Sequence, residues 1–305
     1  MHEARHFLVV SHGSRRSALE ATIEVCTQLT GAGAVPVIAS EQWDELHEVD
    51  PTLDGNARRL EDLDPGVVEL VIVLGGDGTI LRAAELMREH PTVPLLGVNL
   101  GHVGFLAESE RDDLGYTVQR ALARDYTVEE RMTLSVRVKH GDDIVYESWA
   151  LNEATVEKAE RERMLEVVIE VDRRPLSSFG CDGVVMSTPT GSTAYSFSAG
   201  GPVVWPSVEA LLLVPLSAHA LFARPLVVGP DSSLAVEILQ RTDAAAVIWC
   251  DGRRAFDLPP GSRVIVRRSP VPVRLARIHE APFTDRLVNK FQLPVTGWRG
   301  PAGRD

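Results

Sequence analysis

Five residues, Gly75-Gly76-Asp77-Gly78-Thr79, combine the residue types that a phosphate-handling turn requires. Glycines lack a Cβ atom and let backbone N–H groups approach a phosphate, and a helix that follows adds partial positive charge at its N-terminus. Asp77 is unexpected there, because its carboxylate repels phosphate unless it meets a hydroxyl, a metal ion or a proton. The turn therefore predicts chemistry at Asp77; the alternative is a tight turn in which Asp77 caps the helix.

The residues around this turn predict a strand before it and a helix after it. Residues 67–74, VVELVIVL, form an apolar run typical of a strand buried on both faces of a parallel sheet, and residues 79–90 have helical spacing. An open α/β sheet binds ligands at such a strand-to-helix turn. Neither GxxxxGK[ST] nor GxGxxG occurs, which argues against a Walker loop and a dinucleotide fingerprint. Arg82, one turn into the helix, is either a further phosphate ligand or a surface residue.

Two further short motifs contain ligand-binding residue types. Residues 99–106, NLGHVGFL, follow another predicted strand, and they form either a structural turn or a second wall of the same crevice. His102 has no carboxylate partner placed by the sequence, so we assign it no catalytic role. Asn152 and Glu153 interrupt a strand-like alternation, so at least one of them faces inward or lies at a strand end. An amide and a carboxylate suit the edge of an adenine base and ribose hydroxyls.

The longest motif, residues 182–202, is rich in hydroxyl groups and glycines. It offers hydrogen-bond donors to a polyhydroxylated, phosphorylated ligand and an aromatic ring to a base. A serine nucleophile is the competing interpretation, but GxSxG is absent and no histidine is placed by a motif. The hydroxyl-bearing side chains are Thr188, Thr190, Ser192, Thr193, Tyr195, Ser196 and Ser198.

Composition limits the class of protein. The chain has 305 residues and a formal charge of −12, which is too acidic for a protein that coats nucleic acid. Its three cysteines lie far apart without a CxxC motif, which predicts neither a disulfide framework nor a zinc site and favours a reducing cytoplasm. The apolar tract 210–228 is interrupted by prolines and charged residues, so we expect no membrane span.

Hydrophobic periodicity predicts two main domains. Residues 6–38 form a strand, helix and strand, and residues 41–66 look like a surface excursion around a short helix. After about residue 129 the pattern alternates with period two, which indicates antiparallel strands. We therefore predict an α/β domain with a parallel sheet at 1–128, a mostly antiparallel β domain at 129–282, and a segment at 283–305 that returns to the first domain through helical spacing at its start.

Together, GGDGT, NLGHVGFL, the Asn-Glu pair and DGVVMSTPTGSTAYSFSAGGP resemble the motifs of the NAD kinases, in the same order and over roughly residues 6–290. The resemblance implies that ATP and a divalent cation, Mg²⁺ carried with the ATP phosphates, serve to phosphorylate the 2′-hydroxyl of the adenosine ribose of NAD. It also implies a β-sandwich-like C-terminal domain and a homodimer or homotetramer whose site is partly completed by a neighbouring subunit.

The resemblance assigns roles residue by residue. Asp77 matches the catalytic aspartate, and Gly75, Gly76, Gly78, Thr79 and Arg82 match the ATP phosphate site, where Mg²⁺ comes with the nucleotide and no protein ligand is implied. Gly180 and Arg253 differ from residues that relatives often carry, a basic residue and a glutamine. The NAD-binding positions are Asp77, Gly78, Arg82, Asn152, Glu153, Arg163, Asp182, Thr193, Ala194, Tyr195, Ser196, Phe197 and Ser198.

Two rival functions remain open at this point. A lipid or sugar kinase of the same superfamily keeps GGDGT, but it gives no reason for the Asn-Glu pair or the TAYSFS segment. A catalytically silent NAD-binding sensor gives no reason for Asp77. Formation of NADP from ATP and NAD separates all three, and the sequence leaves open whether inorganic polyphosphate or NADH is also accepted.

Overall fold

The computed structural model describes residues 4–12, 15–101, 104–160, 163–241, 244–279 and 282–295. The chain divides into two compact units, Met1–Glu130 with Arg274–Asp305, and Arg131–Val273. The first boundary lies two residues from the expected one at 128. The chain returns to unit 1 at Arg274 rather than at residue 283, because a strand that precedes the C-terminal helix joins the sheet of unit 1.

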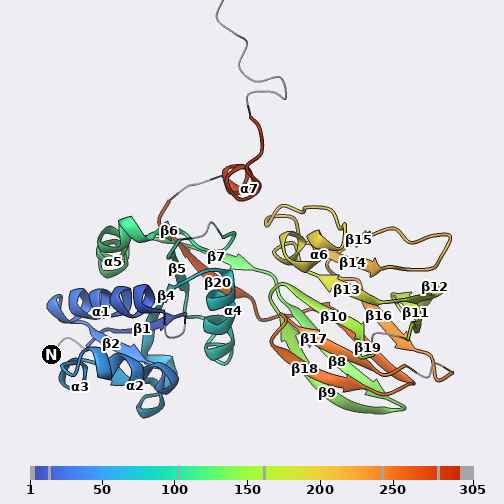
Figure 1. Cartoon of the computed structure of the whole chain (residues 1–305), viewed down its shortest axis with the longest axis horizontal. Coiled ribbons are helices and arrows are strands. Elements are labelled where there is room, and N and C mark those ends of the chain that lie inside the picture. Colours follow the sequence, from blue (N-terminus) through green and yellow to red (C-terminus); the bar gives the residue numbers. More distant parts are fainter. Residues whose placement is uncertain are drawn as a thin grey trace, which may run out of the picture. The chain divides into compact units, whose positions relative to one another are not determined.

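Unit 1 is built on an eight-stranded sheet in the order β3-β2-β1-β4-β5-β20-β7, with β6 paired to β5 (Figure 1). The pairs that join β1 to β2 and β4, β2 to β3, and β5 to β4, β6 and β20 are parallel. Apolar residues fill both faces of β1 and β4, as the continuous apolar runs predict. The strands are β1 (His6–Ser11), β2 (Val35–Ile38), β3 (Arg58–Arg59), β4 (Val68–Leu74), β5 (Leu95–Asn99), β6 (Ser109–Glu110), β7 (Thr127–Arg131) and β20 (Val273–Arg277).

Helices cover both faces of this sheet. On one face Leu96 and Val98 share a core with α1 (Arg16–Gly31) and α5 (Leu114–Leu122). On the other face Gly97 lies against Ile80 of α4 (Asp77–Leu86). The remaining helices are α2 (Ser40–Val49), α3 (Leu53–Asn56) and α7 (Phe283–Phe291), and the 3₁₀ turns are η1 (Leu60–Asp62), η2 (Pro65–Val67) and η3 (Arg111–Asp113).

The segment 41–66 is more than the surface excursion that its acidic composition suggests. Trp43, Leu46 and Leu53 are buried in the core of unit 1, and β3 adds a strand to the sheet. The expectation was wrong because the apolar residues on one side of α2 are widely separated by acidic residues that point outward.

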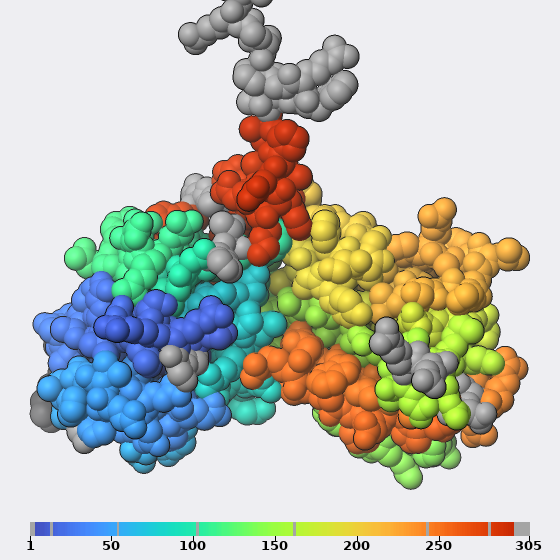
Figure 2. Space-filling model, in the orientation of Figure 1, coloured from blue at the N-terminus to red at the C-terminus, as the bar shows by residue number. Residues whose placement is uncertain are grey.

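Unit 2 consists of two six-stranded antiparallel sheets, in the orders β15-β14-β13-β10-β17-β18 and β12-β11-β16-β19-β8-β9. Alternate residues of both sheets share one core, which makes the unit a β-sandwich. Strands β8, β9, β18 and β19 also contribute to its surface, in the green and orange parts of Figure 2. The elements are β8 (Leu134–His140), β9 (Asp143–Ala150), β10 (Glu153–Lys158), β11 (Leu165–Val171), β12 (Arg174–Cys181), β13 (Gly183–Ser187), η4 (Gly191–Thr193), α6 (Tyr195–Ser198), β14 (Leu211–Leu216), β15 (Leu226–Val228), β16 (Leu234–Ile238), β17 (Ala246–Cys250), β18 (Arg254–Leu258) and β19 (Ser262–Arg268).

Candidate active site

The GGDGT turn joins the end of β4 to the start of α4, as the sequence predicts. Gly75 has φ +156°, and a Cβ atom there would lie 2.4 Å from Oγ1 of Thr79. Its N–H donates to the carbonyl of Val98 on β5, 2.8 Å away. The turn therefore needs glycine at position 75 both for its backbone angle and for its close approach to the helix.

A cavity of about 220 Å³ opens beside this turn in unit 1. The loops after β1, β4 and β5 converge on it, and the strand order places β1 and β4 at the point where the sheet changes direction of winding. Its lining includes two cationic or titratable side chains, His12 and Arg15, that the sequence analysis did not single out. The lining residues are His12, Arg15, Ser17, Ala18, Gly75, Gly76, Asn99, Leu100 and Gly101.

Asp77 does not cap its own helix. Its two carboxylate oxygens accept hydrogen bonds from the backbone N–H groups of Phe105 and Leu106, each at 3.0 Å. Gly104 approaches so closely that a Cβ atom there would lie 2.4 Å from Oδ1 of Asp77. The NLGHVGFL motif is thus a structural partner of GGDGT, although His102 and Val103 lie outside the described residues.

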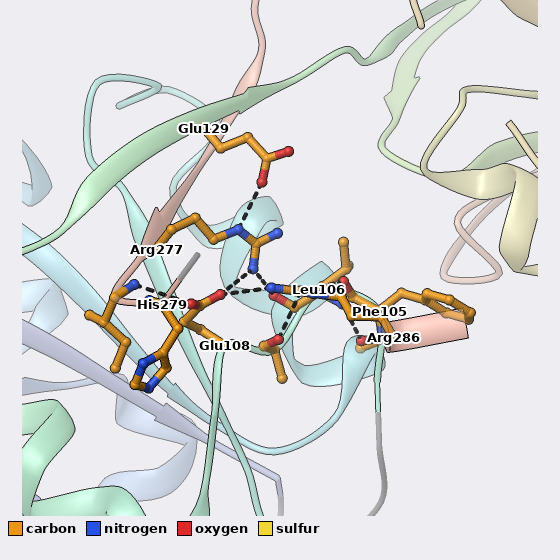
Figure 3. A network of polar contacts seen from close by, with 10 residues as sticks. Phe105, Leu106, Glu108, Glu129, Arg277, His279 and Arg286 are labelled. Atoms are coloured by element: carbon orange, nitrogen blue, oxygen red, sulfur yellow. Dashed lines mark hydrogen bonds and ion pairs between the residues drawn. The ribbon is translucent and has the colours of Figure 1, made fainter. Parts of the chain in front are cut away.

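A network of ion pairs fixes the far side of the same loop (Figure 3). Arg286 of α7 donates to the carbonyls of Phe105 and Ala107 at 2.9 and 3.1 Å, and Arg277 of β20 donates to the carbonyl of Leu106 at 3.0 Å. Both guanidinium groups bind Glu108, whose side chain is fully buried, at 2.8 and 3.0 Å. Glu108 also accepts the N–H of His279 at 2.8 Å.

This network and Asp77 act on opposite ends of one peptide group, the one that joins Phe105 to Leu106. The carbonyl of Phe105 accepts from Arg286, and the N–H of Leu106 in that peptide donates to Asp77. A cation at the oxygen and an anion at the nitrogen polarise the peptide in the same direction, which strengthens both hydrogen bonds. The rings of Phe283 and Phe291 pack on Phe105 with centroids 5.9 and 5.8 Å away, so α7 lies on this loop.

In unit 2, Asn152 and Glu153 lie where β9 ends and β10 begins, at the strand end that the alternation allowed. The carboxylate of Asp251 accepts the N–H groups of Leu151 and Asn152 at 2.9 and 2.7 Å, and Arg254 donates to Asp251 at 2.8 Å. Asp251 comes 98 residues after Glu153, so no local pattern indicates this contact. The sequence feature that could have pointed to Asp251 is the turn CDGRR, in which Asp251 and Gly252 have positive φ.

Glu153 occupies an unusual environment for a carboxylate. It is 8% exposed, and its Oε2 has no hydrogen-bond partner among the described residues. Burial, together with repulsion from Asp251, raises the pKa of Glu153 to about 8, although the N–H of Tyr195 stabilises the charged form. The raised pKa favours the protonated form of this side chain, which can donate a hydrogen bond.

The hydroxyl-rich segment is folded against the Asn-Glu turn. The hydroxyl of Thr188 donates to the carbonyl of Leu151 at 2.6 Å and accepts the N–H of Gly191 at 3.0 Å. A Cβ atom on Gly191 would lie 2.0 Å from the carbonyl oxygen of Asn152. Tyr195 and the ring of Phe197 are exposed, and Ser196 points into the protein.

The remaining predicted site residues differ in how they are held. Asp182 pairs with Lys158 at 2.5 Å, and the pKa of Asp182 is lowered by hydrogen bonds from Lys158 and Ser217. The Tyr195 hydroxyl bonds to Glu157, and burial raises the pKa of that hydroxyl. These side chains share one region of unit 2.

Three further positions named from the sequence have surroundings of other kinds: two arginines that form ion pairs and a glycine beneath a methionine. Arg82 forms an ion pair with Glu41 of α2, and Arg163 pairs with Glu160 at 3.1 Å on the surface. Gly180 lies beneath Met164, whose sulfur would be 2.6 Å from a Cβ atom at position 180. A basic residue at position 180 would therefore require Met164 to move.

Comparison with known proteins agrees with this placement of motifs. The model of the ATP-NAD kinase N-terminal domain matches residues 7–126, and that of the ATP-NAD kinase C-terminal domain matches residues 151–278. The chain is 71% identical over 301 residues to the NAD kinase of Leifsonia xyli subsp. xyli, with 99% of each chain covered. It is 57% identical over 300 residues to NAD kinase 2 of Streptomyces coelicolor, with 97% of each covered.

Solved structures show the same fold. Yeast NADH kinase complexed with NADH superposes with a TM-score of 0.83 at 24% identity, covering 95% of this chain and 87% of that one. An NAD kinase from Archaeoglobus fulgidus in complex with ATP gives a TM-score of 0.63 at 25% identity, covering 85% and 98%. The α/β unit and the antiparallel β unit were both expected from periodicity, and both are confirmed. The chain belongs to the ATP-NAD kinase family, and its reaction is the ATP-dependent phosphorylation of NAD to NADP.

Proposed function

We propose that Asp77 accepts the proton of the 2′-hydroxyl of the adenosine ribose of NAD as that oxygen attacks the γ-phosphorus of ATP and the bond from that phosphorus to the β,γ-bridging oxygen breaks, so that ADP leaves. The observation that carries this role is the fixed carboxylate at the start of α4, next to a glycine turn that lines a cavity. Two N–H donors orient the carboxylate and leave lone pairs on both oxygens for a hydroxyl. Phosphoryl transfer has a loose transition state, so orientation and charge neutralisation contribute more than early proton removal.

The donor phosphates belong, in this proposal, in the cavity beside Gly75 and Gly76. The first N–H groups of α4 have no acceptor within the helix and point towards its N-terminal end, where a phosphate is stabilised. Arg15 and His12 supply the cationic or hydrogen-bonding side chains that the lining offers. We assign Arg82 a smaller part than its sequence position indicates, because Glu41 already neutralises it. Gly78 and Thr79 complete the turn.

Magnesium enters this proposal with the nucleotide. Among the described residues, no group of three or more His, Cys, Asp or Glu side chains could hold a metal ion. The residues present therefore do not build a metal site made of protein ligands alone, and we derive no step through the ion. Omitting the divalent cation and then restoring it in an NADP assay tests the requirement.

The NAD-binding side chains in the proposal come from unit 2. Asn152 and protonated Glu153 offer donors and an acceptor to ribose and adenine, and exposed Tyr195 and Phe197 offer aromatic faces. Asp182 contributes a carboxylate whose orientation Lys158 fixes. The other assigned positions, Arg163, Thr193, Ala194, Ser196 and Ser198, remain predictions.

Assembly and location remain proposals as well. Several large apolar side chains of unit 2 are exposed, among them Trp205, Leu221 and Phe222, which supports a homodimer or homotetramer that covers them. Light scattering coupled to size-exclusion chromatography measures this directly. All three cysteines are buried and free, which supports a reducing cytoplasm. No helix in the described part of the chain is long and apolar enough to span a bilayer.

A single acceptor assay tests the proposed chemistry. The protein is incubated with ATP, Mg²⁺ and either NAD or 2′-deoxy-NAD, and phosphorus NMR locates the new phosphate. We expect 2′-phosphate from NAD and no product from the deoxy compound, because the attacking oxygen is missing. Phosphate on the 3′-oxygen would show that the Asp77 assignment is wrong. A parallel reaction with inorganic polyphosphate in place of ATP, and one with NADH, measure the range of donors and acceptors.

A further inference from the structure

A second cavity, of about 450 Å³, lies entirely within unit 2 on the outer face of the sheet β12-β11-β16-β19-β8-β9. Six of its lining side chains are cationic and none is acidic, in a protein with a formal charge of −12. Its volume falls within the range of small-molecule sites. The lining residues are Ser135, Arg137, Lys139, Ile144, Arg173, Ser233, Arg263, Ile265, Arg267, Arg268 and Pro270.

The strand register brings several of these cations together. Arg263 of β19 lies directly opposite Lys139 of β8, and Arg267 lies opposite Ser135. Like charges that face each other across antiparallel strands destabilise a sheet, so the Arg263–Lys139 pair does not serve stability. Glu237 flanks Arg263 on its other side, in β16. The register therefore places two cations side by side, with a carboxylate on only one side of the pair.

Carboxylates neutralise only part of this charge. Arg137 pairs with Glu147, Arg263 with Glu170 and Arg268 with Glu209, and none of these glutamates lines the cavity. Within the described part of the chain, Lys139, Arg173 and Arg267 have no carboxylate partner; Arg267 donates to the hydroxyl of Ser233 at 3.1 Å. In addition, Nε of Arg263 is buried and has no hydrogen-bond partner there. The lining therefore carries cationic donors that remain available to an anion.

We propose that this cavity is a second anion site, separate from the catalytic one, that binds a linear chain of several phosphates. Five of the six cations are arginines, whose planar guanidinium groups recognise phosphate through paired hydrogen bonds. Arg263 and Arg267 are four residues apart on one strand, which separates them by about 14 Å. That spread matches an elongated polyanion better than one orthophosphate. Ile144, Ile265 and Pro270 add an apolar surface on which the ring of a nucleotide can lie.

The site does not depend on the assignments at Asp77 or Glu153, because none of its residues belongs to the proposed catalytic or NAD-binding groups. Its ligand is either inorganic polyphosphate or the phosphate chain of a nucleotide. Binding should also weaken as salt is added, because the contacts are ionic and largely exposed.

Calorimetry on the full-length protein tests the proposal. Neither ATP nor NAD is added, and the titrants are inorganic tripolyphosphate, guanosine triphosphate and orthophosphate; the cavity variant described below shows which part of the binding belongs to the cavity rather than to the donor site. We expect tripolyphosphate to bind and orthophosphate to bind at least tenfold more weakly. Guanosine triphosphate binding more tightly than tripolyphosphate identifies a nucleotide as the ligand, and the reverse identifies the inorganic chain.

The cavity variant combines Lys139→Glu with Arg267→Glu. The control variant combines Arg58→Glu with Arg241→Glu, which changes the net charge by the same amount outside the cavity. We expect the first pair to weaken tripolyphosphate binding by about 10- to 100-fold and the second to leave it within threefold. NADP formation should stay unchanged in both, which also shows that they fold. Unchanged binding in the cavity variant overturns the proposal. So does equal loss in both pairs, or loss of oligomeric state in the cavity variant without loss of binding.

Discussion

Two carboxylates, Asp77 at the start of α4 in unit 1 and Glu153 at the start of β10 in unit 2, lie in family motifs but have different surroundings. Both oxygens of Asp77 accept backbone N–H groups at 3.0 Å. Glu153 keeps one oxygen without a partner among the described residues, and its pKa rises to about 8.

The difference arises from what surrounds each group. Asp77 accepts two backbone N–H groups, and the carbonyl of the peptide that supplies one of them binds Arg286. Glu153 shares its turn with a second carboxylate, Asp251, which already takes the N–H groups of Leu151 and Asn152. We infer that Asp77 serves turnover as the proton acceptor and that Glu153 serves binding as a neutral donor.

The largest expected effect is that of Asp77→Asn on turnover. An amide cannot accept the ribose proton, so NADP formation should fall by about 10²- to 10⁴-fold. Steady-state assays with ATP and Mg²⁺ measure this, and calorimetry should show NAD affinity within a few-fold of the parent. Thermal unfolding provides the control for folding. Turnover within a few-fold of the parent would remove Asp77 from the mechanism.

Gly104→Ala should disturb the hydrogen bonds that the loop makes to Asp77 while leaving Asp77 itself in the sequence. The added Cβ atom would lie 2.4 Å from Oδ1 of Asp77, so the carboxylate must move. A displacement of about 1 Å at a reacting group can lower the rate about 100-fold, and we expect a loss of about 10- to 100-fold in kcat. Gly115→Ala is the matched control, because its Cβ would meet only the side chain of Gln28, no closer than 3.6 Å. Equal kcat in the two variants would contradict the positional role of the loop.

Asp251→Asn tests what holds the Asn-Glu turn. It leaves Arg254 without its buried carboxylate, so the free energy of unfolding should fall by about 3 kcal/mol in urea titrations at pH 7. The variant should also bring the pKa of Glu153 down, because the repelling charge is gone. Carbon NMR of the Glu153 carboxyl can follow this. An unchanged Glu153 titration would mean that burial alone sets its pKa.

Glu153→Gln should change the free energy of unfolding by an amount that depends on pH. Because the folded-state pKa of Glu153, about 8, lies above its ordinary value of 4.5, the folded protein binds more protons between these values. The contribution of Glu153 to stability is therefore fully present below about pH 4.5 and is lost as pH rises towards 8. Urea titrations at pH 5 and pH 8.5 measure the free energy of unfolding of both proteins. The value for the variant relative to the parent should be higher at pH 8.5 than at pH 5 by a few kcal/mol. A pH-independent difference would contradict the raised pKa.

The sequence predicted the parts of this comparison that are local. GGDGT was expected between a buried strand and a helix, and one residue of Asn152-Glu153 either facing inward or at a strand end, because apolar runs and alternation determine those positions. The partners could not be predicted. Asp77 meets a loop 28 residues away, Glu108 meets Arg277 at a separation of 169, and Asp251 meets Asn152 at a separation of 99. Such contacts depend on how the sheets are assembled, which single-strand patterns do not encode.

Single-turnover rates at saturating ATP and NAD provide the most direct test of the division between Asp77 and Glu153. Rapid quenching separates the chemical step from NAD binding, and the compared proteins are the parent, Asp77→Asn and Glu153→Gln. The account predicts that Asp77→Asn stays slow by about 10²-fold or more at every NAD concentration, whereas Glu153→Gln approaches the parent rate once NAD saturates. A Glu153→Gln protein that remains as slow as Asp77→Asn at saturating NAD, or an Asp77→Asn protein that recovers, would contradict it.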